Sequence, residues 1–149
     1  MIYVLNKEEM EKRISTANEA GLVAILYEVL IENFKDSIQC LEDKKYDELK
    51  YINSNSRDIL AQLISTLKGD SEIAGNLMSI YIYLNKLMTN GETKKDKTSF
   101  ENSIKIVKPL YEGFRELEKE QNPKVVTGLT YGKGQLEECV LESNKVFKG

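Results

Sequence analysis

Composition argues against most forms of catalysis. The chain has 149 residues, a length typical of one domain, with 21 Lys and Arg against 24 Asp and Glu. The absence of histidine excludes Ser-His-Asp and Cys-His sites, zinc sites with a histidine ligand and the Glu-x-x-His di-iron signature. Cys40 and Cys139 lack the Cys-x-x-Cys spacing of a zinc or redox site. We therefore expect a protein that is not an enzyme and binds no metal or cofactor.

Charge and hydropathy narrow the class of partner and the compartment. The net charge of −3 argues against nucleic acid, whose binding needs a clustered basic face. No stretch approaches the roughly 18 uncharged apolar residues of a membrane span. The N-terminal residues lack a basic region leading into a longer apolar stretch, so they predict no secretory signal. We expect a cytoplasmic protein with reduced thiols.

The first predicted element is a short helix. Asn6 suits the N-cap position, and Glu9 stands where a capping box needs it, so Lys7–Arg13 can form two turns. Met10 is the only apolar residue of that segment. A helix this short and polar needs a partner surface to be stable.

Four longer amphipathic helices are predicted next. They run from about Asn18 to Leu41, Tyr46 to Lys68, Ser71 to Thr89, and Thr98 to Gln121, with apolar residues at steps of three and four. Short polar turns between them favour antiparallel neighbours. The pattern predicts an all-α fold, an antiparallel four-helix bundle with a short N-terminal helix.

The two prolines and a group of glycines divide the chain further. Pro109 lies inside the fourth long helix and predicts a kink in the preceding turn, whereas Pro123 stops that helix. Three glycines within residues 128–134 make that segment too flexible for a bundle helix. We therefore predict a bundle domain over residues 1–123 and a flexible C-terminal tail over residues 124–149.

The segment Gly128–Gly134 also has a faint similarity to a phosphate-binding loop. That loop needs four residues between its glycines and a Ser or Thr after the Lys, to reach magnesium. Here three residues separate Gly128 from Gly132, and Gly134 takes the hydroxyl position. Nucleotide binding is therefore the weaker alternative.

Two tyrosines on the third long helix suggest a binding surface. Tyr81 and Tyr83 are two residues apart and therefore point about 200° apart around a helix. We expect one in the core and the other facing outward. Exposed tyrosines often mark a protein-binding surface, although rings that plug the ends of the bundle are the alternative interpretation.

Four motifs follow one another along most of the chain. They are Val23–Tyr27, an apolar run ending in Leu-Tyr; Arg57–Leu63; Ile80–Leu84, which reads Ile-Tyr-Ile-Tyr-Leu; and Leu110–Phe114. In this order and spacing they resemble the flagellar secretion chaperone family FliS. The resemblance covers roughly residues 14–121.

The resemblance implies both a fold and a function. Members of this family form an antiparallel four-helix bundle that binds the disordered C-terminal segment of flagellin. They thereby prevent premature polymerisation and support flagellum assembly. The partners implied are flagellin and export-apparatus components, without nucleic acid or a membrane span. A helical adaptor or secretion chaperone for another client is the alternative.

The family pattern also suggests which residues contact the client. We expect outward aromatic and aliphatic positions near the motifs to do so, namely Leu22, Ile25, Tyr27, Tyr83 and Leu87. In this family the N-terminal arm can cover part of the empty groove. We expect Ile2–Ile14 to do so here, because that arm begins with four apolar residues.

Overall fold

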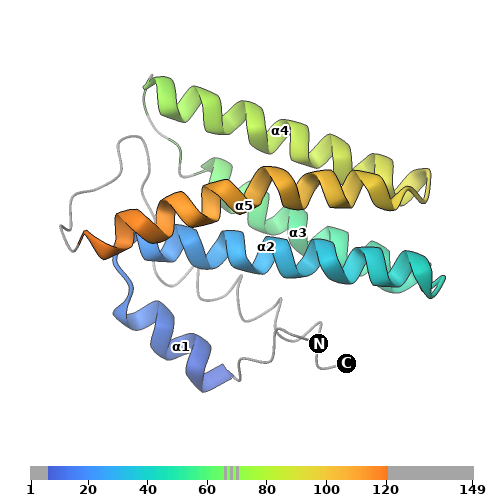
Figure 1. The fold of residues 1–149 in the computed structure, drawn as a ribbon, viewed down its shortest axis with the longest axis horizontal. Helices are drawn as coiled ribbons and strands as arrows, with labels where there is room; N and C mark the ends of the chain where they lie inside the picture. The colour runs from blue at the N-terminus through green and yellow to red at the C-terminus, as the bar shows by residue number, and fades with distance from the viewer. Residues whose placement is uncertain (1–6, 66, 68, 70, 121–149) are drawn as a thin grey trace.

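A computed structural model describes residues 7–65, 67, 69 and 71–120 of the chain. That part forms five helices: α1 (Lys7–Thr16), α2 (Glu19–Glu42), α3 (Tyr46–Ser65), α4 (Glu72–Thr93) and α5 (Lys97–Lys119). Helices α2 to α5 run alternately in opposite directions, and α1 lies beneath the start of α2 (Figure 1). The predicted all-α bundle with a short N-terminal helix is therefore confirmed. The predicted tail, including Gly128–Gly134, lies outside the described residues, and so do the first residues of the arm.

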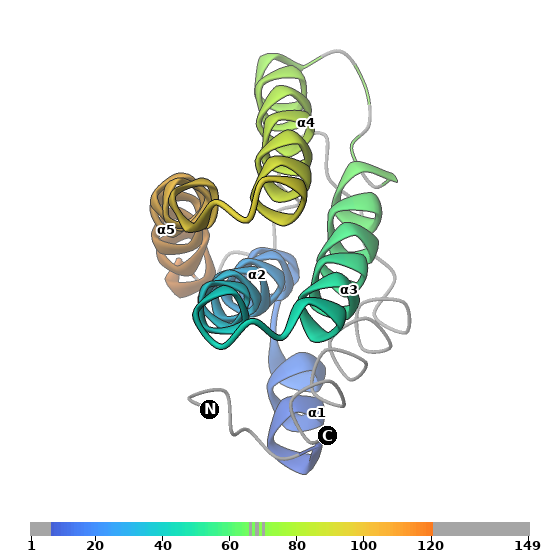
Figure 2. The same cartoon turned by 90° about the vertical axis from the view of Figure 1, so that its right-hand side faces the viewer.

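Helix α2 is the centre of the packing. It contacts α1, α3 and α5, and every residue from Ala20 to Tyr27 is buried. Seen along the bundle, α2 lies between α3 and α5, while α4 and α1 lie at opposite ends of the molecule (Figure 2). Apolar residues all round the segment Ala20–Tyr27 explain this place, because a helical segment without a polar face must be covered on every side.

Buried polar side chains fix how α3 sits against its neighbours. The amide of Asn33 on α2 donates to Asn55 Oδ1 (3.0 Å) and to the Ser56 hydroxyl (2.9 Å) on α3. The amide of Asn53 donates to the backbone oxygen of Met88 on α4 (3.2 Å) and to Glu92 (2.9 Å). Since a buried amide without partners is costly, these contacts favour a single register of the three helices.

Helix α4 is longer than the sequence predicts. We expected it to end at about Thr89, and this is wrong, because α4 continues through Asn90 and Gly91 to Thr93. Gly91 is instead a point of close packing, where an added Cβ would lie 2.5 Å from a ring carbon of Phe100 on α5. Its lack of a side chain serves helix contact rather than termination.

Pro109 does not interrupt the last helix. Helix α5 runs as one element from Lys97 to Lys119 with Pro109 inside it. Pro109 and Lys105 are both exposed, so water can satisfy the Lys105 carbonyl that loses its N–H partner. The kink stays a prediction.

The turns after α2 and after α4 share an unusual backbone conformation. Lys44 and Lys95 have φ angles of 57° and 52°, in the left-handed region. In the first turn the Lys45 N–H donates to the Cys40 carbonyl at 2.8 Å, the six-residue bond of a Schellman motif. Glycine usually occupies the left-handed position of that motif, because a side chain there is strained.

Replacing Lys44 by glycine should therefore stabilise the protein. We expect Lys44→Gly to raise the free energy of unfolding by about 0.5–1 kcal/mol in urea titrations, since the strain is relieved. The matched control is Lys50→Gly on the exposed side of α3, which should lower it by about 1 kcal/mol. If Lys44→Gly and Lys50→Gly lowered the free energy of unfolding by similar amounts, the assignment of strain to Lys44 would be contradicted.

A pair of tyrosines connects α2 to α4 through the core. The hydroxyl oxygens of Tyr27 and Tyr81 are 2.6 Å apart and both side chains are fully buried. Burial strongly raises the pKa of the Tyr81 phenol, so this group stays protonated at any pH at which the protein is handled. The Tyr27 ring also meets Phe114 of α5 edge-on, with ring centroids 5.5 Å apart. Three helices therefore meet at this pair.

A double-mutant cycle should reveal the coupling between the two hydroxyls. Tyr81→Phe and Tyr27→Phe should each cost about 1–2 kcal/mol, and the double variant should cost less than their sum, because one hydrogen bond is lost in all three. Thermal and urea unfolding measure these costs. The exposed Tyr83→Phe should change stability by less than about 0.5 kcal/mol. Strict additivity would contradict a direct bond.

Candidate protein-binding surfaces

Helix α4 presents apolar side chains away from the core. Tyr83 is 52% exposed and Ile73 is 41% exposed, while Ile80 and Leu87 are partly buried. These four residues follow one another at steps of seven, three and four, so they form one line along the helix. We call Ile73, Ile80, Tyr83 and Leu87 the α4 stripe. The expectation that one of Tyr81 and Tyr83 is core and the other faces outward is confirmed.

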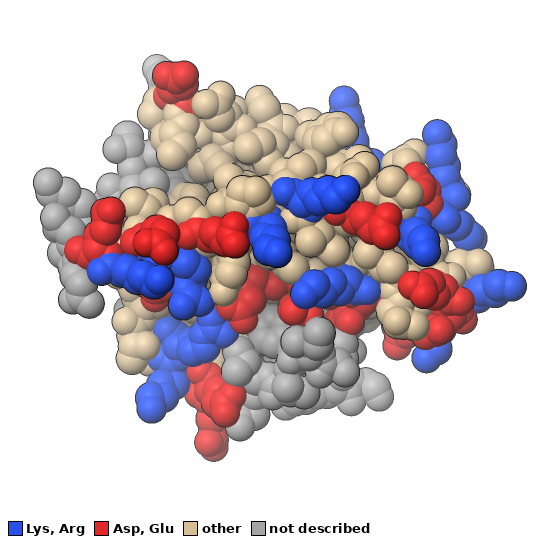
Figure 3. Space-filling view, in the orientation of Figure 1, with Lys and Arg blue, Asp and Glu red and all other residues tan. Residues whose placement is uncertain are grey.

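Helix α4 is also unusually poor in charge. It has three charged residues among 22, namely Glu72, Lys86 and Glu92, whereas α5 has nine among 23. In the space-filling view, the surface over α4 is mostly neutral and the charges gather along α5 and around α1 (Figure 3). An exposed apolar surface with so few charges is typical of a protein-binding site.

Apolar positions on α5 border the α4 stripe. The amide of Asn90, one step of three beyond Leu87, donates to the Ser99 hydroxyl of α5 at 2.8 Å. Helical spacing from Ser99 leads to Ile106, Leu110 and Leu117, which lie on the side of α5 toward α4. Ile106 and Leu110 are partly buried, and Leu117 is 38% exposed. Helical spacing therefore places further apolar positions of α5 on the same side of that helix as Ser99.

The five predicted contact residues do not form one exposed site. Tyr83 faces outward as expected and Leu87 is partly buried, but Leu22, Ile25 and Tyr27 are only 3%, 4% and 0% exposed. The expectation that these three face outward is therefore wrong in this structure. Periodicity could not separate inward from outward positions here, because apolar residues lie all round the segment Ala20–Tyr27.

The three predicted contact residues that are buried on α2 lie in two different places. Tyr27 lies in the core against Phe114 and Tyr81. Ile25 shares the lining of a pocket with Arg13 of α1, and Leu22 lies on the same face of α2 by helical spacing. That face is the one that α3 and α5 leave for α1.

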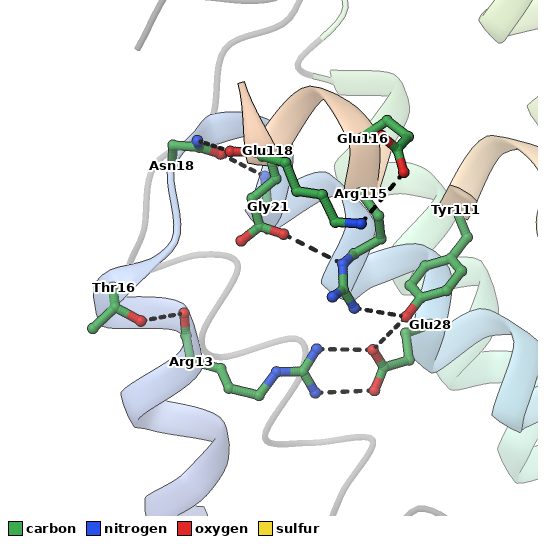
Figure 4. Close-up of polar contacts among 10 residues, drawn as sticks. Arg13, Thr16, Asn18, Gly21, Glu28, Tyr111, Arg115, Glu116 and Glu118 are labelled. Atoms are coloured by element: carbon green, nitrogen blue, oxygen red, sulfur yellow. Dashed lines mark hydrogen bonds and ion pairs between the residues drawn. The ribbon is translucent and has the colours of Figure 1, made fainter. Parts of the chain in front are cut away.

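Helix α1 is attached to α2 by apolar contacts and by one ion pair. Met10 and Ile14 are 0% and 1% exposed. Between them, the Arg13 guanidinium donates two hydrogen bonds to the two carboxylate oxygens of Glu28, at 2.9 and 2.8 Å (Figure 4). A bidentate, partly buried pair of this kind is stronger and more specific than an ordinary surface ion pair. No motif in the sequence pointed to it.

The ion pair continues into α5. The Tyr111 hydroxyl donates to Glu28 at 3.4 Å, and Arg115 donates to the Tyr111 oxygen at 2.9 Å (Figure 4). A pocket of about 140 Å³ lies beside this network. It is lined by Arg13, Thr16, Gly21, Ile25, Arg115 and Glu118. Helices α1, α2 and α5 thus meet at one polar junction.

Carboxylates line the same face of α2 beyond this junction. Glu32 and Asp36 follow Glu28 at steps of four, so the three side chains lie one turn apart. Burial, and then the charge of Glu32, raise the pKa of Asp36 from 3.8 to about 7. The buried Oδ2 of Asp36 has no hydrogen-bond partner among the described residues. This end of the face is acidic.

The raised pKa of Asp36 predicts how stability depends on pH. The folded protein holds the carboxyl proton of Asp36 more tightly than the unfolded chain does. The contribution of this proton to the free energy of unfolding is therefore complete below about pH 4 and is lost as pH rises through about 7. Asp36→Asn does not ionise, so it should melt at a higher temperature than the parent near pH 8 and at a similar one near pH 4. The exposed Asp58→Asn on α3 is the control. Identical pH profiles of parent and Asp36→Asn would contradict this.

Among the described residues, no helix is long and apolar enough to cross a membrane. No group of three or more His, Cys, Asp and Glu side chains there is arranged to hold a metal ion.

Comparison with known proteins places this arrangement in a family. No curated protein matches the chain significantly. The family model described as flagellar protein FliS matches residues 1–121. The match includes all five helices and both surfaces described above, on α4 and on α2. This chain therefore belongs to the FliS family of flagellar proteins.

Proposed function

We propose that this protein is a cytoplasmic export chaperone that binds the disordered C-terminal segment of flagellin. The observation that carries the proposal is the exposed, nearly uncharged α4 stripe in a member of a flagellar protein family. In this role it would cover apolar parts of flagellin that otherwise pair with other copies, and so prevent polymerisation before export. It would act by binding alone, in contact with flagellin and with components of the export apparatus.

The physical demands of such a client agree with the α4 stripe. A disordered segment loses conformational entropy when it is ordered by binding, so it needs a large apolar area in compensation. Ile73 and Tyr83 on α4 and Leu117 on α5 offer exposed area of this kind. An amphipathic client helix would lay its apolar face between α4 and α5, as in other helix-in-groove complexes.

A second client surface lies beneath α1. Leu22 and Ile25 are buried here, but they lie on the only face of α2 that is covered by a short helix rather than by a long one among the described residues. We propose that the N-terminal segment, residues 2–14, covers this face until the client replaces it. The two surfaces together would allow one extended segment to wrap around the bundle.

Two other functions compete with this one. A helical adaptor or secretion chaperone for another client would use the same α4 stripe, so the binding experiment below decides between them. Nucleotide binding would need the segment Gly128–Gly134, which lies outside the described residues, and it has no supporting feature among the described helices. The flagellin chaperone is therefore the function that we propose.

The proposal predicts a stoichiometric complex that depends on Tyr83. Mixed with the C-terminal segment of flagellin from the same genome, the protein should form a one-to-one complex in size-exclusion chromatography and calorimetry. Tyr83→Ser should weaken the complex on the order of tenfold, as for an aromatic anchor at an interface, with unchanged melting of the free protein.

A matched control is available on α3. Tyr51 is 65% exposed and its exposed neighbours at helical spacing, Asp47, Ser54 and Asp58, are polar. Tyr51→Ser should therefore leave the affinity unchanged. Absence of any complex at tens of micromolar would overturn the proposed client, and equal effects of the two serine variants would remove the α4 stripe from the interface.

A further inference from the structure

Helix α1 shows which kind of helix the face of α2 accepts. Its buried residues Met10 and Ile14, and Ala17 just beyond it, follow the steps of four and three that define one apolar line on a helix. Arg13 stands beside that line and directs its guanidinium to Glu28 (Figure 4). The occupant of this face is therefore apolar with one cation in a defined position.

Glu28 makes that cation necessary. It is the only charged residue between Ala20 and Ile31, and its side chain is 24% exposed. Its two carboxylate oxygens accept hydrogen bonds from Arg13 at 2.9 and 2.8 Å, and the Tyr111 hydroxyl approaches at 3.4 Å. A partly buried carboxylate that loses its cation and gains an apolar neighbour is strongly disfavoured. Any helix that replaces α1 must therefore supply a positive charge at the same place.

The rest of the face has the same preference. Glu32 and Asp36 continue the line of carboxylates from Glu28 at one-turn intervals. Lys35 lies 3.6 Å from Glu32, and Asp36 also experiences the negative charge of Glu48 at the start of α3. The balance along this line is acidic, which complements a basic segment and repels an acidic one.

We propose that Glu28 selects the client segment that replaces α1 on this face of α2. The segment is a helix with a Lys or Arg between two apolar residues, spaced as Met10, Arg13 and Ile14 are. Arg13 occupies the position of that cation until the client arrives. This inference rests on the proposed function, because it specifies the chemistry of the flagellin segment that replaces α1.

Variants of the full chain separate selection by Glu28 from a purely structural ion pair. Arg13→Ala removes the internal competitor, so the flagellin segment should bind on the order of fivefold more tightly than to the parent. The variant Arg13→Ala already lacks the ion pair between α1 and Glu28. A change in affinity when Glu28→Gln is added to it therefore reports contact between Glu28 and the client. We expect this double variant to bind roughly fivefold to tenfold more weakly than Arg13→Ala.

The control and the contradicting result use the same background. Arg13→Ala/Glu112→Gln changes an exposed carboxylate on α5, and it should bind as Arg13→Ala does. Melting temperatures of all variants verify that the bundle is intact. Equal affinities of Arg13→Ala and Arg13→Ala/Glu28→Gln would overturn the proposal, because Glu28 would then serve only to hold α1.

A pair of designed peptides makes the test independent of flagellin. Both are helical with leucines at the positions of Met10 and Ile14, and they differ only in Arg or Glu at the position of Arg13. The Arg peptide should bind the full-length Arg13→Ala variant at least about fivefold more tightly. Equal binding, or absence of binding by both, would overturn selection by Glu28. If the Arg peptide is preferred but no flagellin segment binds, the proposed client is wrong and the preference of the face stands.

Discussion

The structure depends on the need to cover α2 on every side. Fourteen of its 24 residues are buried, including eight in succession from Ala20 to Tyr27. Two long helices, α3 and α5, can flank it, but a third side remains toward which Leu22 and Ile25 point. A short and mostly polar helix covers that side, and it does so with few apolar residues of its own. The ion pair between Arg13 and Glu28 follows from this arrangement, because Glu28 interrupts an otherwise apolar face.

Helix α4, on the opposite side of the bundle, leaves apolar side chains exposed. Helix α4 joins the core through Leu77, Tyr81, Leu84 and Met88, while Ile73 and Tyr83 face outward. Few charges accompany them, whereas α5 has nine charged residues among its 23. Polar contacts hold the α4–α5 end of the bundle: Asn53 reaches Met88 and Glu92, and Asn90 reaches Ser99. A protein that binds an apolar segment needs such a surface, firmly supported and left uncovered.

In the proposed chaperone, the two surfaces would contribute to recognition in different ways. The α4 stripe is apolar and poor in charge, so it offers area with little discrimination between apolar helices. The face of α2 includes the carboxylate of Glu28, which in our proposal would disfavour helices that lack a cation at the position of Arg13. Selectivity of this kind comes from the cost of an unpaired charge rather than from additional attraction. Buried area and charge therefore contribute separately to affinity and to choice of partner.

Much of the fold was determined by the sequence alone, because local patterns are enough for it. Steps of three and four located the long helices, and the spacing of Tyr81 and Tyr83 required one of them to face outward. The family followed from the order of short motifs. Only the tertiary structure decided that Leu22 and Ile25 are covered, that Gly91 packs on Phe100, and that Arg13 meets Glu28. These outcomes depend on which helices become neighbours, and helical periodicity does not specify the neighbours of a helix that is apolar all round.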